Sequence, residues 1–216
     1  MMSDCVKLNS REMAEFAADG LLRFDGIIPN EINQQFLADA GSIDTSNGEK
    51  GSNRTVKNLG NLMGHSKLPE VTPGTVLNTA YKETTALGEL VRLPVVRGAI
   101  ESLVGPESLV DHHFLHLALP TSYYKAAGIP QRSQHTHQDS TIDPRRAFDI
   151  QLFYFPHEVG LDMGGTRYVP GTHLRIVSES AIARYQNIRG QQHVVCPAGT
   201  LILMHHGIWH GGGINR

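Results

Sequence analysis

The first hundred residues carry apolar positions at helical spacing between polar segments. Asn9 and Glu12 have the spacing of a capping box, and an apolar stripe then runs to Gly20, which predicts a helix. Pro29 opens a second amphipathic stripe, and Gly41 follows its last apolar position. We therefore expect two short helices, each closed by a glycine.

Three other segments complete this half of the chain. Residues 21–28 (LLRFDGII) predict a short strand or an extended link, and residues 84–105 predict two helical pieces that meet near Pro94. Residues 42–58 are polar and rich in Gly, Ser and Asn, which is typical of a loop. This loop is either a solvated connection or a lid over a site.

From about residue 108 the pattern changes to short β-rich runs separated by Gly and Pro turns. One helical interruption is expected at residues 178–190. The runs cover residues 109–120, 148–156, 166–174, 192–197 and 200–206. Short strands in succession favour a sandwich or barrel. We expect a mainly β fold with flanking α-helices, in a single domain over residues 1–216, with a helical flank at 1–107 and a barrel core at 108–216.

Composition narrows the functional class. The 216 residues are 40% hydrophobic and carry a formal charge of -2, and no basic run or membrane-length apolar stretch occurs, so we expect neither a nucleic-acid nor a membrane partner. The N-terminus lacks the apolar segment of a signal peptide, and the two cysteines, Cys5 and Cys196, argue against a disulfide scaffold. These features predict a cytoplasmic protein. Twelve histidines, gathered in the middle and near the end, direct attention to a metal.

The stretch SQHTHQDST, residues 133–141, contains the candidate chemistry. In a strand His137 and Asp139 project from one face while Gln138 points away. Two histidines and one carboxylate on one side of a metal ion form the facial triad of non-haem Fe(II) oxygenases, which leaves positions open for ligands. The alternative is an ordinary polar strand end. A closed structural zinc site is not expected, because the chain has no CxxC pair.

A third ligand has to come from elsewhere in the chain. Three histidines near the end, His205, His206 and His210, compete for this place. A barrel brings strands that are distant in sequence to face one interior. The glycines at 211–213 allow close approach of backbone and ligand. His135, two residues before His137, is either a neighbour of the site or an exposed strand-end residue.

Three motifs together resemble the phytanoyl-CoA dioxygenase family: HQD at 137–139, GGTRYVPGTH at 164–173 and HHGIWHGGGIN at 205–215. The resemblance implies a double-stranded β-helix (a jelly-roll, cupin-like core) and a dioxygenase dependent on Fe(II), 2-oxoglutarate and O2. It implies that His137, Asp139 and His210 are the catalytic iron ligands, and that His173 is a turn residue. The expected reaction is hydroxylation of a small organic metabolite, with succinate and CO2 as co-products.

The sequence also departs from the family. The family's arginine for 2-oxoglutarate lies about ten residues beyond the distal histidine, whereas the chain ends at Arg216, so we expect this arginine and the last barrel strand beyond Arg216. Asp139 favours hydroxylation over halogenation, because halogenases of this type have a small residue there. We expect Arg167 to form a structural ion pair. The competing hypothesis is a cupin-like metal-binding barrel without oxygenase activity, an isomerase or a binding module.

Overall fold

The computed structural model describes residues 5–40, 71–139, 148–175, 177–185 and 187–216. The chain forms two compact units. The helical unit consists of Met1–Asn9 and Ile28–Leu117, and the β unit consists of Ser10–Ile27 and Ala118–Arg216. The expected lid at 42–58 lies outside the described residues. The expected flank and core on either side of residue 108 stay a prediction.

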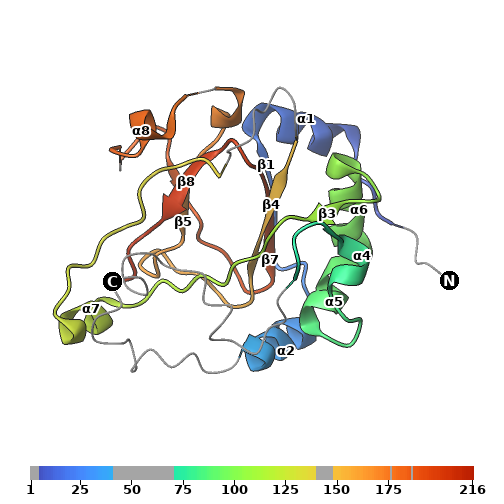
Figure 1. The fold of residues 1–216 in the computed structure, drawn as a ribbon, viewed down its shortest axis with the longest axis horizontal. Helices are drawn as coiled ribbons and strands as arrows, with labels where there is room; N and C mark the ends of the chain where they lie inside the picture. The colour runs from blue at the N-terminus through green and yellow to red at the C-terminus, as the bar shows by residue number, and fades with distance from the viewer. Residues whose placement is uncertain (1–4, 41–70, 140–147, 176, 186) are drawn as a thin grey trace. The chain divides into compact units, whose positions relative to one another are not determined.

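Two three-stranded antiparallel sheets build the β unit (Figure 1). The first has the order β1-β7-β4, and the second has the order β6-β5-β8. Their strands are β1 (Leu21–Phe24), β4 (Ile150–Phe155), β5 (Thr166–Val169), β6 (Gln192–His193), β7 (Thr200–His205) and β8 (Trp209–Gly212). Four of the five β-rich runs expected from the sequence thus contain a strand of these sheets.

One apolar cluster joins the two sheets. Strand β7 is buried along its whole length, and β1 and β4 pair with its two edges. Its Ile202 and Met204 meet Leu21 of β1 and Tyr168 of β5 in the same cluster, and Phe153 of β4 packs against them. The β unit therefore has an interior toward which both sheets turn a face.

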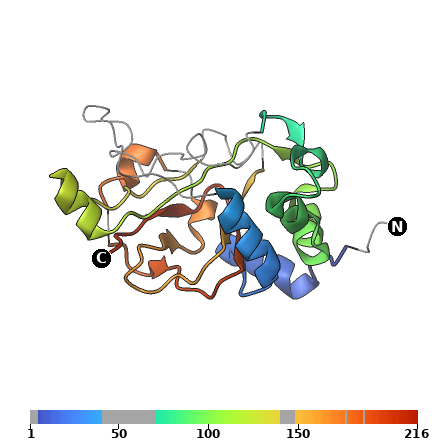
Figure 2. The same cartoon turned by 90° about the horizontal axis from the view of Figure 1, so that it is seen from below.

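Short helices complete the β unit. Helix α1 (Ser10–Asp19) ends at Gly20, which has a φ of +76°, as the sequence predicts. Helix α7 (Thr121–Ala127) ends at a left-handed glycine, and α8 (Glu179–Ile182) and the 3₁₀ turn η2 (Thr172–Leu174) are single turns. Both views place the C-terminal residues beside the start of α7 (Figures 1 and 2), where the Asn215 Nδ2 donates to the carbonyl of Ala118 over 2.6 Å.

The helical unit contains α2, α4, α5 and α6 with a two-stranded ribbon. Their bounds are α2 (Asn30–Ala40), α4 (Leu77–Ala80), α5 (Ala86–Arg92), α6 (Pro94–Val104), β2 (Thr75–Val76) and β3 (Leu109–Val110). The break near Pro94 is confirmed, because α5 ends at Arg92 and Pro94 opens α6. The helix expected after Pro29 is confirmed as α2.

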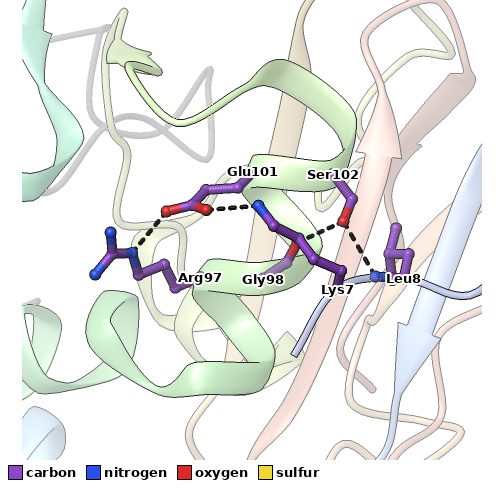
Figure 3. Close-up of polar contacts among 6 residues, drawn as sticks. All are labelled: Lys7, Leu8, Arg97, Gly98, Glu101 and Ser102. Atoms are coloured by element: carbon purple, nitrogen blue, oxygen red, sulfur yellow. Dashed lines mark hydrogen bonds and ion pairs between the residues drawn. The ribbon is translucent and has the colours of Figure 1, made fainter. Parts of the chain in front are cut away.

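The N-terminal segment of the helical unit is fixed to α6 (Figure 3). The Lys7 Nζ and the Arg97 Nε contact the two carboxylate oxygens of Glu101, over 2.5 and 2.7 Å. The Leu8 amide donates to the Ser102 hydroxyl over 3.0 Å. A Cβ at Gly98 would lie only 1.9 Å from the Val6 carbonyl oxygen, so the absence of a side chain there permits this approach.

The strand expected over residues 109–120 is wrong beyond Val110. Side chains two positions apart in this segment do lie together, as they would in a strand. The ring centroids of His112 and Phe114 are 4.5 Å apart, and those of Phe114 and His116 are 5.6 Å apart. A strand also needs a pairing partner, and no described segment pairs with residues 111–117.

None of the described helices combines the length and the apolar character needed to cross a bilayer.

Candidate metal centre

Backbone pairing brings the two distant motifs together. The amide of His137 donates to the carbonyl of His210, and the amide of His210 donates to the carbonyl of His137, both over 2.9 Å. Residues paired in this way in an antiparallel ladder carry their side chains on the same face. Asp139 continues the contact, because its amide donates to the carbonyl of His206 over 3.3 Å. Asp139 and His210, which are 71 positions apart in the sequence, are thereby brought into one site.

Three side chains converge at this pairing. The Nε2 of His137 lies 3.1 Å from Asp139 Oδ1, and the Nε2 of His210 lies 3.3 Å from Asp139 Oδ2. All three donor atoms lie within 4.8 Å of one another. The two imidazole rings have centroids 4.4 Å apart. A single metal ion can be held by donors spaced in this way.

Hydrogen bonds to backbone carbonyls fix the tautomers of both histidines. The Nδ1 of His137 donates to the carbonyl of His135 over 2.9 Å, and the Nδ1 of His210 donates to the carbonyl of Ile208 over 3.0 Å. In a neutral imidazole with its proton on Nδ1, the Nε2 carries a lone pair. When both rings are neutral, two lone pairs face the carboxylate of Asp139, an arrangement that a cation between them would stabilise. The donor set fits a divalent metal.

Asp139 is the most accessible of the three. Its side chain is 35% exposed, whereas those of His137 and His210 are 13% and 7% exposed. Burial raises the pKa of the Asp139 carboxyl, but hydrogen bonds from His137 and His210, and the positive charges of these two rings when they are protonated, outweigh burial and hold the pKa well below its ordinary value. The carboxyl is thus ionised at neutral pH, as a metal ligand has to be.

The neighbouring residues support the pairing. Gln138 points away from the three donors, as the sequence predicts, and its Nε2 donates to the carbonyl of Gly207 over 2.8 Å. A Cβ at Gly211 would lie 2.7 Å from the carbonyl oxygen of His135, so the expected close approach at this glycine is confirmed. The ring of Phe153 lies 5.9 Å from that of His210, edge to face.

The competing histidines lie in a separate cluster. His205 stacks on His206 with ring centroids 4.3 Å apart, and His173 lies 4.9 Å from His205. The Nδ1 of His205 accepts from the amide of Gly207 over 2.9 Å, and burial lowers the pKa of His205 to about 4. His173 lies in the turn η2. Among the described residues, only the group of His137, Asp139 and His210 brings three metal-ligating atoms this close.

Sequence reasoning missed the backbone groups that prepare the site. The carbonyls of His135 and Ile208 set the tautomers, and no side-chain pattern indicates a carbonyl. His135 itself is exposed.

Arg167, expected in an ion pair, donates from Nη2 to the carbonyl of Gln134 over 2.5 Å. Arg216 contacts Asp162, and both side chains are more than 70% exposed.

Solved structures of other proteins share this fold. The carbocyclase SnoK from nogalamycin biosynthesis, described as non-haem and alpha-ketoglutarate dependent, is 14% identical over 99% of this chain and 81% of its own, with a TM-score of 0.52. HygX from Streptomyces hygroscopicus, with nickel and 2-oxoglutarate bound, is 12% identical over 98% and 82%, with a TM-score of 0.53. AviO1 from Streptomyces viridochromogenes Tue57 is 16% identical over 98% and 90%, with a TM-score of 0.58. At this identity the likeness establishes the fold alone.

Sequence comparison identifies the family. Among curated proteins, none matches this chain significantly in sequence. The sequence model of the phytanoyl-CoA dioxygenase (PhyH) family matches residues 16–216, which includes the three motifs and nearly the whole chain. The chain belongs to the phytanoyl-CoA dioxygenase (PhyH) family.

Proposed function

We propose that this protein is an Fe(II)- and 2-oxoglutarate-dependent dioxygenase that hydroxylates a small organic metabolite. The observation that carries the proposal is the convergence of His137, Asp139 and His210 within 4.8 Å, with both histidines already turned to present Nε2. Family membership and the 2-oxoglutarate named for HygX and SnoK favour this cofactor set. We also propose that the two sheets of the β unit are the halves of a double-stranded β-helix.

The charges of the three ligands suit an anionic co-substrate. Two neutral imidazoles and one carboxylate leave a bound divalent ion with a net charge of about +1, which favours a chelating anion in the open positions. The two histidines occupy the buried side and Asp139 the accessible side. We infer that 2-oxoglutarate and substrate approach from the side of Asp139.

The protein's own part in the reaction is to bind and orient the reactants and to exclude water from the site. Bound iron(II), together with 2-oxoglutarate and O2, supplies an oxidant able to replace a substrate C–H hydrogen by hydroxyl, and the balanced products are the alcohol, succinate and CO2. The carbonyls of His135 and Ile208 would keep the two imidazole rings in the orientation that a metal needs. Phe153, whose ring packs edge to face with that of His210, would help to exclude water from that side of the site.

An anaerobic titration with Fe(II) and then 2-oxoglutarate tests the proposal. We expect a visible metal-to-ligand charge-transfer band in the wild type and no band in Asp139→Ala or His210→Ala. His205→Ala is the matched control, because His205 is a nearby histidine outside the triad, and its band should remain. Tight metal binding without a band would support the alternative, a cupin-like metal-binding barrel without oxygenase activity. Absence of metal binding in the wild type would overturn both.

A further inference from the structure

Two of the three proposed ligands lie on a segment that is only sparsely paired. Residues 134–139 join β8 through a single isolated bridge, His137 with His210, and through one further amide bond, and a second amide bond reaches the residue that follows β7. The Gln134 amide donates to the carbonyl of Gly212 over 3.1 Å, and the Asp139 amide donates to the carbonyl of His206 over 3.3 Å. Since one strand pairing of this length is weak, the distance between His137 and His210 depends on side-chain support.

Arg167 supplies such support from the far side of β8. It lies on β5 opposite Gly211 in the antiparallel register, and it is 5% exposed. Its Nη2 reaches past β8 and donates to the carbonyl of Gln134 over 2.5 Å, while Nη1 lies 3.5 Å from the Oε1 of Gln191. One guanidinium thus connects β5 with the segment that carries His137 and Asp139.

Gly211 provides the space through which Arg167 passes. A Cβ at position 211 would lie 3.1 Å from the Arg167 Nη2 and 2.7 Å from the His135 carbonyl oxygen. Any side chain there would displace the guanidinium, the segment or both. The residue beside His210 is therefore small because two neighbours occupy its side-chain position.

The carbonyl that Arg167 holds belongs to the same turn of chain that orients His137. Gln134 precedes His135, whose carbonyl accepts the Nδ1–H of His137. The Gln134 side chain also accepts from the amide of Gly212 over 2.8 Å, so Gln134 is fixed through both its backbone and its side chain. A charged donor to a carbonyl is among the stronger hydrogen bonds in proteins. Movement of Gln134 would move the acceptor that sets the tautomer of His137.

We propose that Arg167 is a positioning residue of the metal centre, which holds the segment of His137 and Asp139 at the correct separation from His210. This inference rests on the proposed metal binding by these three residues. Arg167 contacts neither metal nor substrate in this arrangement. It acts through Gln134 and His135, so its loss should change the affinity and geometry of the metal site as well as the stability of the fold.

The test compares metal binding in Arg167→Lys, Arg167→Met and Gly211→Ala with the wild type. Anaerobic Co(II) titration gives both the Kd and the d–d absorption spectrum, which reports ligand geometry. We expect Kd to rise about 10–100-fold in Arg167→Met, as for other residues that orient metal ligands, with an altered spectrum. Arg167→Lys should lie between Met and wild type, because lysine keeps one charged donor but loses the planar fork. Gly211→Ala should weaken binding in the same direction.

Arg23→Lys is the matched control. Arg23 lies in the same β unit and likewise donates from Nη2 to a carbonyl, that of Val195, over 2.6 Å. A merely structural role for Arg167 predicts that both arginine variants lower the Tm while the Co(II) affinity and spectrum remain unchanged, and this result would overturn the proposal. If Arg167→Met does not fold, the Co(II) affinities and spectra of Arg167→Lys and Gly211→Ala decide whether the proposal holds. Failure of the wild type to bind Co(II) would instead refute the proposed function.

Discussion

Two carboxylates of this molecule lie between pairs of basic side chains, and the two arrangements differ in where the positive charge comes from. Glu101 in the helical unit contacts Lys7 and Arg97, which carry fixed charges. Asp139 in the β unit contacts the Nε2 atoms of two histidines whose Nδ1 protons are already used on backbone carbonyls. The first group has its positive charges within the chain, whereas the second is suited to a cation from solution.

On the proposed assignment, the difference separates a structural ion-pair network from a metal-binding site. Hydrogen bonds from Lys7 and Arg97 lower the pKa of Glu101 to about 2, and this network joins the N-terminal segment to α6. At Asp139 the converging acceptors leave a place between them, which is what a metal site requires before the metal arrives. A low carboxylate pKa alone would not distinguish the two, since the pKa of Asp139 is lowered as well.

The largest expected effect comes from removing the charge of Asp139. Asp139→Asn keeps the shape but replaces a charged ligand by an amide, so the affinity for Fe(II) or Co(II) should fall at least about 100-fold. A competition titration with a chromogenic chelator measures this change. Glu101→Gln is the control and should bind metal like the wild type. Equal metal affinity in wild type and Asp139→Asn would remove the distinction between the two carboxylates.

Metal addition should stabilise the wild type. A ligand that binds only the folded state at 100 times its Kd adds about 2.7 kcal/mol to the free energy of unfolding, or roughly 5–10 °C in Tm for a chain of this size. Anaerobic thermal unfolding with and without Co(II) measures the shift, and a chelator should reverse it. Asp139→Asn should show little shift. A shift of equal size in that variant would indicate binding elsewhere.

Gly98→Ala tests the attachment in the helical unit. Helix propensity alone predicts stabilisation by about 1 kcal/mol, because alanine is the better helix former. The contact predicts the opposite sign, since the new Cβ would meet the Val6 carbonyl oxygen at 1.9 Å. We expect destabilisation by about 1–3 kcal/mol in urea unfolding, with metal affinity unchanged. Stabilisation would show that the N-terminal segment does not lie on α6 in solution.

The smallest effect is the pH dependence of Glu101. Its pKa in the folded state is lowered to about 2, so its contribution is complete above the unfolded pKa near 4.5 and is lost as the pH falls toward about 2. Wild type and Glu101→Gln should differ by up to about 1 kcal/mol at pH 7, and the difference should shrink between about pH 5 and 2. Glu107→Gln, at an exposed position, is the control. A difference independent of pH would exclude the ion pairs as its cause.

The sequence was informative wherever a local rule applied. Helix α1 between its capping pair and Gly20, and the break at Pro94, follow from single residues and their neighbours. The grouping of His137 with Asp139 follows from strand alternation, but the addition of His210 required the family resemblance, because strand pairing across 71 residues has no local signal. Arg167 opposite Gly211 illustrates the limit, since only the register of β5 and β8 brings them together.

Uneven exposure around the three donors has a kinetic consequence. His210 and His137 are 7% and 13% exposed, while Asp139 is 35% exposed, so water reaches the proposed ligand Asp139 more readily than the two histidines. On the proposed ligand assignment, an ion bound here should exchange with solution without unfolding of the sheets. The identity of the bound ion should then follow the ions that are available around the protein.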